Sequence, residues 1–203
     1  MNIDNKKHWE NVYATKQPNE VSWTQEVPTT SLQFIDSFSI DKNATIIDIG
    51  GGDSRLVDYL LDKGFVNISV LDISSKSLEK AKHRLGSKAK KVNWIVTDIT
   101  EFNPSIKYDV WHDRAAFHFL TKQSQIEKYK NTINEAKVKN IIISTFSTEG
   151  PLKCSGLEIK QYNKETLEEL FLQDFKVLHS ENEKHTTPFG TTQDFVFVSL
   201  QRK

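Results

Sequence analysis

From residue 44 onward, apolar runs alternate with amphipathic segments, and this alternation constrains the fold more than any other feature. The predicted strands are continuous, apolar and rich in β-branched residues, which is typical of strands buried on both faces of a sheet; they lie at 44–49, 67–73, 92–99, 108–113 and 140–146. Helical spacing and capping residues predict helices at 53–64, 74–86, 123–137 and 163–173. Strands that alternate with helices indicate βαβ units and a mostly parallel sheet.

The end of the chain departs from this alternation. Two further strands are predicted at 175–182 and 193–202, and only a turn joins them. Because no helix intervenes, we expect an antiparallel hairpin. The α/β sheet should therefore have seven strands, with the last one inserted antiparallel to its neighbours.

The chain of 203 residues is long enough for one domain with a sizeable core, and no repeat or linker divides it. We therefore expect a single domain over 1–203, with a segment at 1–40 that is helical in pieces and a core at 41–203. The 27 basic and 27 acidic residues balance, so nothing in the charge favours a nucleic acid or a membrane surface as partner. The lone Cys154, with no secretory signal or membrane span, predicts a soluble, cytoplasmic protein.

A glycine-rich turn follows the first predicted strand. Asp48 lies near the end of that strand, and Gly50, Gly51 and Gly52 come directly after it. In a doubly wound sheet, ligands bind outside the carboxyl ends of the strands. Glycines there let the backbone approach a ligand that a Cβ atom would exclude, so the turn is a candidate binding site.

The ligand of this turn is not predicted to be a pyrophosphate. The dinucleotide pattern requires a third glycine, and Arg55 stands in its place. Asp53 is predicted to start the next helix, where its carboxylate would repel phosphates. These residues favour a positively charged ligand over NAD.

Three successive strands end in an aspartate: Asp48, Asp72 and Asp98. A carboxylate in the position of Asp72 can accept hydrogen bonds from a ribose diol, and one in the position of Asp98 can accept from an exocyclic amine such as that of adenine. Taken singly, Asp48 or Asp98 is equally well explained as a cap of the adjacent turn. Three acids along one edge of a sheet favour a nucleoside site.

Over roughly residues 40–200, the chain resembles the class I S-adenosylmethionine-dependent methyltransferases. The resemblance rests on D-I-G-G-G at 48–52, V-L-D-I at 70–73, V-T-D-I at 96–99 and Y-D-V-W-H-D-R at 108–114. It implies a Rossmann-like seven-stranded sheet in the order 3-2-1-4-5-7-6, with strand 7 antiparallel and helices on both faces. It also implies that residues 1–40 form an N-terminal helical lid.

The resemblance further implies which residues bind S-adenosyl-L-methionine and its product S-adenosyl-L-homocysteine. Asp48 and the glycines at 50–52 would contact the methionine and ribose. Asp72 would bind the ribose hydroxyls, and Asp98 would meet the adenine amine. Ile73 and Ile99 would pack against the faces of the ring.

The fourth strand and the turn after it carry His112, Asp113, Arg114 and His118. The resemblance places groups for the methionine and the acceptor here, so we assign His112 and Arg114 to the cofactor, and Asp113 and His118 as candidate catalytic residues. Two alternatives remain open. Asp113 and Arg114 could pair with each other, and His118 could be an ordinary core histidine.

Aromatic residues in the N-terminal segment are candidates for a lid. Trp23 could contact the cofactor through a cation–π interaction with the sulfonium, or it could simply pack the lid onto the sheet, as could Trp9 and Tyr13. The loops at 147–162 and 185–193 are expected to wall the acceptor pocket. Cys154 has no His or acid next to it in sequence, so we expect it to be unreactive.

The leading hypothesis is methyl transfer to a small-molecule acceptor, with no metal, nucleic acid or membrane involved. A protein lysine or amine methyltransferase is the first alternative. A non-catalytic protein that binds the same cofactor is the second, although it would have no need for all of these site residues. Asp53 and Arg55 argue against a further alternative, an NAD-dependent oxidoreductase.

Overall fold

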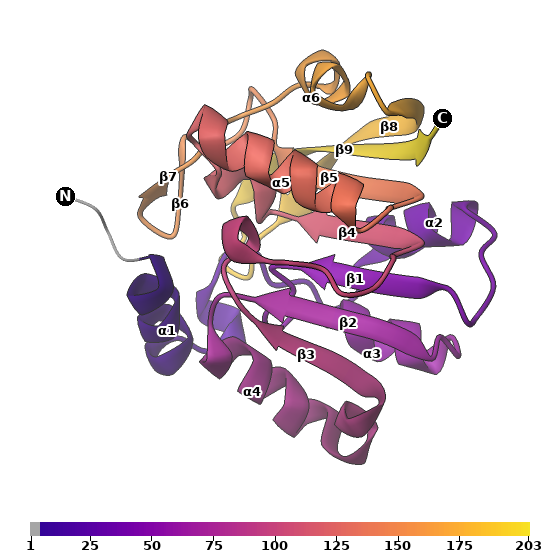
Figure 1. The fold of residues 1–203 in the computed structure, drawn as a ribbon. Helices are drawn as coiled ribbons and strands as arrows, with labels where there is room; N and C mark the ends of the chain where they lie inside the picture. The colour runs from indigo at the N-terminus through magenta and orange to yellow at the C-terminus, as the bar shows by residue number, and fades with distance from the viewer. Residues whose placement is uncertain (1–4) are drawn as a thin grey trace.

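The computed structural model describes residues 5–203. Its central feature is a seven-stranded sheet in the order β3-β2-β1-β4-β5-β9-β8 (Figure 1). The strands are β1 (Thr45–Ile49), β2 (Asn67–Asp72), β3 (Val92–Val96), β4 (Val110–Arg114), β5 (Asn140–Phe146), β8 (Phe175–Thr186) and β9 (Thr192–Arg202). Strands β1 to β5 pair in parallel, and β9 lies antiparallel between β5 and β8. With β8 and β9 counted as the sixth and seventh strands, the predicted order is confirmed.

Helices flank the sheet. The α-helices are α1 (Asn5–Thr15), α2 (Thr29–Ser37), α3 (Leu56–Asp62), α4 (Ser75–Leu85), α5 (Gln123–Glu135) and α6 (Lys164–Phe171). Short 3-10 helices are η1 (Pro18–Glu20), η2 (Gly86–Lys91), η3 (Ile99–Glu101) and η4 (Phe117–Phe119). The segment 147–162 differs from prediction: it was expected to be a loop, but β6 (Lys153–Cys154) and β7 (Leu157–Glu158) form a small separate hairpin there.

Two hydrophobic cores lie on opposite faces of the sheet. Helices α2, α3 and α4 pack on one face together with strand residues such as Ile46 and Val110. Helices α5 and α6 pack on the other face, together with Ile47 and Trp111. Because successive strand residues point to opposite faces, the continuous apolar strands supply both cores at once. In Figure 1, α5 crosses in front of the sheet, with α2 and α3 behind it.

Local sequence explains where two of the helices begin. Ser74 caps α4 by accepting a hydrogen bond from the Ser77 N–H, and Asn163 caps α6 in the same way. The prediction was wrong for α3, which begins at Leu56 and not at Asp53. Ser54 Oγ accepts from the Leu56 N–H at 3.1 Å, so the residues from 53 to 55 belong to the turn.

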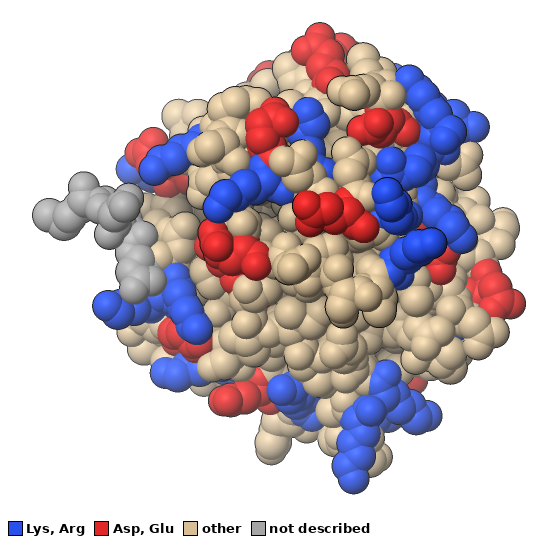
Figure 2. Space-filling view, viewed as in Figure 1, with Lys and Arg blue, Asp and Glu red and all other residues tan. Residues whose placement is uncertain are grey.

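Helix α1 and the segment after it lie across the carboxyl ends of β1 and β2, beside α4 (Figure 1). Lys and Arg side chains are interspersed with Asp and Glu over the face shown in Figure 2. Among residues 5–203, none of the helices is long and apolar enough to cross a membrane.

Candidate functional site

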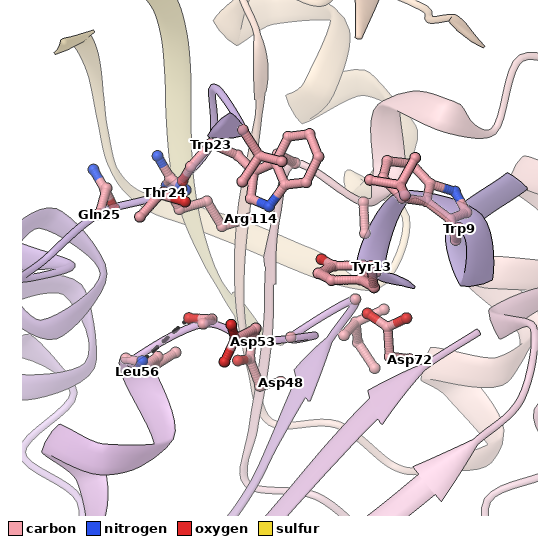
Figure 3. A pocket seen from close by; sticks show the side chains of 18 of the residues that line it. Trp9, Tyr13, Trp23, Thr24, Gln25, Asp48, Asp53, Leu56, Asp72 and Arg114 are labelled. Carbon is pink, nitrogen blue, oxygen red and sulfur yellow. Dashed lines mark hydrogen bonds between the residues drawn. The ribbon is translucent and has the colours of Figure 1, made fainter. Parts of the chain in front are cut away.

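A pocket of about 800 Å³ opens at the carboxyl ends of β1, β2 and β4, beneath the N-terminal segment. Such a volume is in the range of small-molecule and cofactor sites. Many of its lining residues belong to the strand ends and the lid (Figure 3), and they include Trp9, Tyr13, Trp23, Ser31, Asp48, Gly50, Gly51, Asp72, Ile73, Asp98, Ile99, His112 and Arg114. Thus nearly all residues assigned to the cofactor from sequence surround one cavity.

The glycine turn is closely packed on every side. Gly50 has a φ of +62°, and a Cβ atom there would lie 2.5 Å from the Ala116 Cβ. A Cβ atom on Gly51 would lie 2.6 Å from Asp48 Oδ2. Neither position can hold a larger residue without moving its neighbours, so the missing side chains are required by the pocket floor.

Gly52 is the one predicted glycine that does not line the cavity. It has a φ of +49°, and the Tyr13 hydroxyl would lie 2.6 Å from a Cβ atom at this position. Tyr13, on α1, therefore covers the part of the turn that a ligand would otherwise contact. Burial and the nearby Asp72 raise the pKa of Tyr13 well above its usual value, so its hydroxyl stays neutral.

Asp72 is buried at the end of β2. Its Oδ1 accepts the Ser74 N–H at 2.8 Å, while Oδ2 is directed toward Gly52. Burial raises the pKa of Asp72 to about 7, and the negative charges of Asp48 and Glu10 act in the same direction. A cationic ligand in the cavity would stabilise the ionised form.

Asp98 has both of the roles that the sequence left open. It caps η3, because its Oδ1 accepts from the backbone N–H and the hydroxyl of Thr100, both at 2.8 Å. It also lines the cavity, together with Ile73 and Ile99. The cap holds the carboxyl group in place without using both of its oxygens.

Asp53 does not start a helix as predicted, and its charge is compensated. Its carboxylate forms an ion pair with Arg84 of α4, and the same guanidinium also pairs with Asp58 at 2.9 Å. Asp53 is therefore neither at a helix N-terminus nor uncompensated. Its charge therefore does not exclude a phosphate. Only the missing third glycine still disfavours a dinucleotide in this turn.

Asp48 and His112 are joined in a buried hydrogen-bonded chain. His112 Nδ1 lies 2.7 Å from Asp48 Oδ1, and His112 Nε2 lies 2.8 Å from Ser31 Oγ. A carboxylate can only accept, so Nδ1 carries a proton and donates to Asp48, while Nε2 is hydrogen-bonded to the Ser31 hydroxyl, which can donate or accept. Both ring nitrogens are used, and His112 fixes the cavity wall between β1, β4 and α2. Ser31 was not predicted as a site residue.

The two candidate catalytic residues lie outside the cavity. Asp113 is fully buried, and its Oδ1 accepts the N–H groups of Ala116 (3.0 Å) and Phe117 (2.9 Å). Its Oδ2 accepts the Tyr129 hydroxyl at 2.8 Å, and burial raises its pKa to about 6. The catalytic assignment of Asp113 is corrected accordingly: its carboxylate holds the turn after β4, and it does not pair with Arg114.

His118 is likewise a core histidine. It is fully buried against Phe119 and Phe146, and its Nδ1 accepts the Phe146 N–H at 3.3 Å. Burial, and secondarily the charge of Arg114, lowers its pKa to about 3. A ring that faces the core cannot reach an acceptor in the cavity, so its assignment as catalytic is corrected too.

Arg114, the last residue of β4, turns toward the lid. Its Nη1 donates to the Trp23 carbonyl at 3.0 Å, and its guanidinium lies 5.1 Å from the centre of the Phe195 ring. Burial lowers its pKa to about 10, which leaves it charged at neutral pH. The next residue, Ala115, has a φ of +66°, an uncommon conformation for alanine that turns the chain sharply away from β4.

Aromatic rings form the roof of the cavity. The Trp23 ring lies 5.7 Å from Trp9 and 6.3 Å from Tyr13, and Trp9 also packs against Phe119 at 5.2 Å. Figure 3 shows Trp9 and Tyr13 on α1, above Asp72, and Trp23 near Arg114. Trp23 thus both packs the lid and lines the cavity, so the two roles weighed from sequence are compatible.

Further polar contacts, in addition to that between Arg114 and Trp23, hold the lid in place. Glu10 of α1 reaches the N-terminus of α4, where its carboxylate accepts the N–H groups of Ser75 (2.7 Å) and Lys76 (3.2 Å). His185 on β8 lies 2.6 Å from the Ser22 carbonyl, joining the lid to the hairpin. Local sequence patterns carry no sign of these contacts, because each joins segments far apart in the chain.

The hairpin and the small β6–β7 unit close the far side of the cavity. The lining residues there are Cys154, Thr186, Thr187 and Pro188. Burial raises the pKa of Cys154 to about 12, so its thiol stays protonated. The expectation that both loops wall the cavity therefore agrees with the structure, while Phe189 and Gln193 of the turn do not line it.

Comparison with known proteins agrees with this geometry. A family model described as a methyltransferase domain matches residues 47–136. The chain is 26% identical over 163 residues to malonyl-[acyl-carrier protein] O-methyltransferase 2 of Ilyobacter polytropus, covering 74% of this chain and 62% of that protein. It is 23% identical over 186 residues to EEF1A lysine methyltransferase 2 of Danio rerio, covering 87% and 77%.

The fold has close structural relatives. The crystal structure of a SAM-dependent methyltransferase from Anabaena variabilis superimposes with a TM-score of 0.76 at 15% identity, covering 100% of this chain and 96% of that one. The chain spans only 39% to 62% of the malonyl-[acyl-carrier protein] O-methyltransferases that it matches. The domain match, the strand order and these relatives together support the resemblance to the class I S-adenosylmethionine-dependent methyltransferases.

Proposed function

We propose that this protein transfers the methyl group of S-adenosyl-L-methionine to a small-molecule acceptor bound in the cavity. The observation that carries the proposal is the meeting of the glycine turn, Asp72 and Asp98 around one cavity at adjacent strand ends. Each feature alone has a purely structural explanation. Their convergence beneath an aromatic lid is what a cationic nucleoside requires.

The residues present fit this cofactor. Gly50 and Gly51 form the floor of the cavity, where a Cβ atom would collide with Ala116 or Asp48, and the ionised form of Asp72 suits a ribose diol. Asp98 keeps one carboxyl oxygen free for the adenine amine, with Ile73 and Ile99 beside it. When bound, the cofactor supplies an electrophilic methyl group on a positively charged sulfur.

The protein's own contribution is to position the reactants and exclude water. The rings of Trp9, Tyr13 and Trp23 cover the cavity, and an aromatic face near a sulfonium stabilises its charge. Positioning alone can supply much of the rate of a displacement between two bound groups. With Asp113 and His118 turned into the core, the proposal assigns no side chain as a general base, and none is needed for an acceptor that is already deprotonated.

A binding experiment tests the cofactor half of the proposal. S-Adenosylhomocysteine should raise the melting temperature of the protein, and NAD should not. Asp72→Ala should abolish the shift, while Asp62→Ala, which removes an exposed carboxylate on α3 paired with Lys88, should leave it intact. If NAD stabilises the protein and S-adenosylhomocysteine does not, an NAD-dependent reaction replaces this proposal.

A lysine methyltransferase is the second candidate, favoured by the extent of the match to the zebrafish enzyme. The roof formed by the lid and by Thr186 to Pro188 favours a small acceptor, because a protein chain would have to displace it. An experiment with labelled S-adenosylmethionine distinguishes the two candidate functions. A cell extract is separated by dialysis into its proteins and its small molecules, and methyl transfer to each fraction is measured. Label in neither fraction, with intact cofactor binding, would indicate a non-catalytic binding protein.

A further inference from the structure

Arg114 has hydrogen-bonding capacity that the fold does not use. Its Nη1 donates to the Trp23 carbonyl, but its Nε and Nη2 atoms are buried and have no partner among the described residues. Buried guanidinium donors are costly when unpaired, so this edge of Arg114 needs an explanation. Arg114 lines the cavity, which is where a missing partner would come from.

The nearby acidic groups do not supply that partner. Glu183 and Asp48 are close enough to influence the pKa of Arg114 but bind elsewhere. Glu183 Oε1 accepts from Gln25 Nε2 at 3.0 Å, Glu183 Oε2 is buried without a hydrogen-bond partner among the described residues, and Asp48 Oδ1 pairs with His112. They compensate the charge of Arg114 from a distance and leave its Nε–Nη2 edge open.

The geometry of that edge selects a ligand chemistry. The Nε and Nη2 hydrogens lie side by side and point the same way, which matches the two oxygens of a carboxylate in a bidentate pair. A phosphate dianion fits less well, because Asp48 and Glu183 would repel its second charge and no second cation lies beside Arg114 in the cavity lining described. The structure thus favours a carboxylate carrying a single charge.

Arg114 also lies on the acceptor side of the cavity. It ends β4 next to Ser144 of β5 and stacks on Phe195 of β9, in the half of the sheet away from Asp72 and Asp98. The residues that influence its charge include Glu183 on β8 and Cys154 in the β6–β7 hairpin. These elements close the end of the cavity opposite the nucleoside site.

We propose that the methyl acceptor carries a carboxylate, and that the Nε–Nη2 edge of Arg114 binds it. This inference rests on the proposed methyltransferase function and names the substrate class. It revises the assignment of Arg114 to the cofactor, because an arginine committed to the methionine carboxylate would leave the acceptor end without a cation.

Binding measurements separate these two roles of Arg114. The probes are propionate, butyrate and benzoate, each with its amide (propionamide, butyramide and benzamide), titrated by calorimetry into protein saturated with S-adenosylhomocysteine. At least one carboxylate should bind and its amide should not. In Arg114→Met the dissociation constant for that carboxylate should rise by about tenfold or more, as expected for a lost charge-assisted pair.

The same variant should bind S-adenosylhomocysteine and 5′-methylthioadenosine, which lacks the amino-acid portion, as tightly as the wild type does. Lys107→Met, which removes an exposed lysine away from the cavity, is the matched control. If Arg114→Met folds poorly, Arg114→Lys is the second variant. It keeps the positive charge but removes the paired Nε–Nη2 donors, so it should still weaken binding of the carboxylate.

Two results would overturn the inference. In the first, none of the carboxylates binds the saturated wild type, or each binds Arg114→Met or Arg114→Lys equally well. In the second, Arg114→Met weakens binding of S-adenosylhomocysteine but not binding of 5′-methylthioadenosine. That result would assign Arg114 to the carboxylate of the methionine portion. If S-adenosylhomocysteine fails to bind the wild type at all, the proposed function itself fails, and that outcome is visible before any carboxylate is added.

Discussion

The two ends of the cavity are built in different ways. The end at β1, β2 and η3 uses backbone turns and strand-end acids, so Gly50, Asp72 and Asp98 take their places once the strand order is set. The end at β4 and the hairpin is assembled from remote segments, where Arg114 meets Trp23 and His185 meets Ser22. The first end therefore depends mainly on local sequence, whereas the second depends on contacts between segments far apart in the chain.

Substituting the glycine turn should have the largest effect. Gly50→Ala places a methyl group 2.5 Å from the Ala116 Cβ at a φ of +62°, so both collision and backbone strain oppose it. We expect a loss of about 2–4 kcal/mol in the free energy of unfolding, with a melting temperature lower by about 5–15 °C. Binding of S-adenosylhomocysteine should fall below detection in calorimetry.

Gly64→Ala is the control for Gly50→Ala. Gly64 has a φ of +88° with nothing within 4 Å of its Cβ position, so it shares the strain without the collision. Gly64→Ala should therefore lower the free energy of unfolding by about 1 kcal/mol and leave cofactor binding unchanged. Equal losses of stability and binding in the two variants would mean that the turn is not a closely packed binding surface.

Asp72→Asn should weaken binding while strengthening the fold. Loss of charge-assisted hydrogen bonds to a ribose diol predicts about a 30-fold or larger rise in the dissociation constant of S-adenosylhomocysteine. The pKa of Asp72 is about 7 in the folded protein against 3.8 for an ordinary aspartate, so the folded protein binds more protons between these values. Its stability therefore decreases as the pH rises through this range.

The asparagine variant lacks that penalty, so its melting temperature should exceed that of the wild type at pH 8 and approach it at pH 4. Asp62→Asn, at an exposed position, should show neither change. A melting temperature at pH 8 below that of the wild type would show that the buried charge of Asp72 is already compensated without ligand.

Loosening the lid should have a smaller effect. Burial alone would raise the pKa of Glu10, but hydrogen bonds from Ser75, Lys76 and the hydroxyls of Ser74 and Ser75 bring it below its usual value, so the carboxylate stays ionised at the α4 N-terminus. Glu10→Ala should speed dissociation of S-adenosylhomocysteine about three- to tenfold in stopped-flow displacement. The control is Glu79→Ala, an exposed glutamate of α4; equal rates in both variants would show that the Glu10 contact does not retain the lid.

The core histidine should matter least. Because its pKa is lowered to about 3, His118 is neutral throughout the working pH range and cannot contribute an inflection near pH 6.5. His118→Gln should keep the rate of methyl transfer within about threefold of the wild type, since its ring does not line the cavity. A drop of more than about a hundredfold, with cofactor binding intact, would restore His118 as a catalytic residue.

These contrasts explain what could be predicted from sequence. The strand order and the acids of the nucleoside end follow from local patterns, because a buried strand and the turn after it are contiguous in the chain. His118 could not be placed correctly, since the left-handed Ala115 redirects the chain before it. Asp113 was misassigned because its partners Ala116, Phe117 and Tyr129 lie in the turn after β4 and on α5. Glu10 and Ser31 were missed because their partners, Ser75 and His112, lie 65 and 81 residues away.

The covering of Gly52 by Tyr13 has a thermodynamic consequence. A ligand that uses the space above Gly52 must first move the Tyr13 hydroxyl out of it, and Tyr13 carries contacts with Trp9 and Trp23. Binding is then an exchange of one packed arrangement for another. The measured affinity reports the difference in free energy between these two arrangements. Replacing Tyr13 by a smaller residue removes the cost of displacing its hydroxyl, so it can tighten binding even though the ligand then loses a contact with Tyr13.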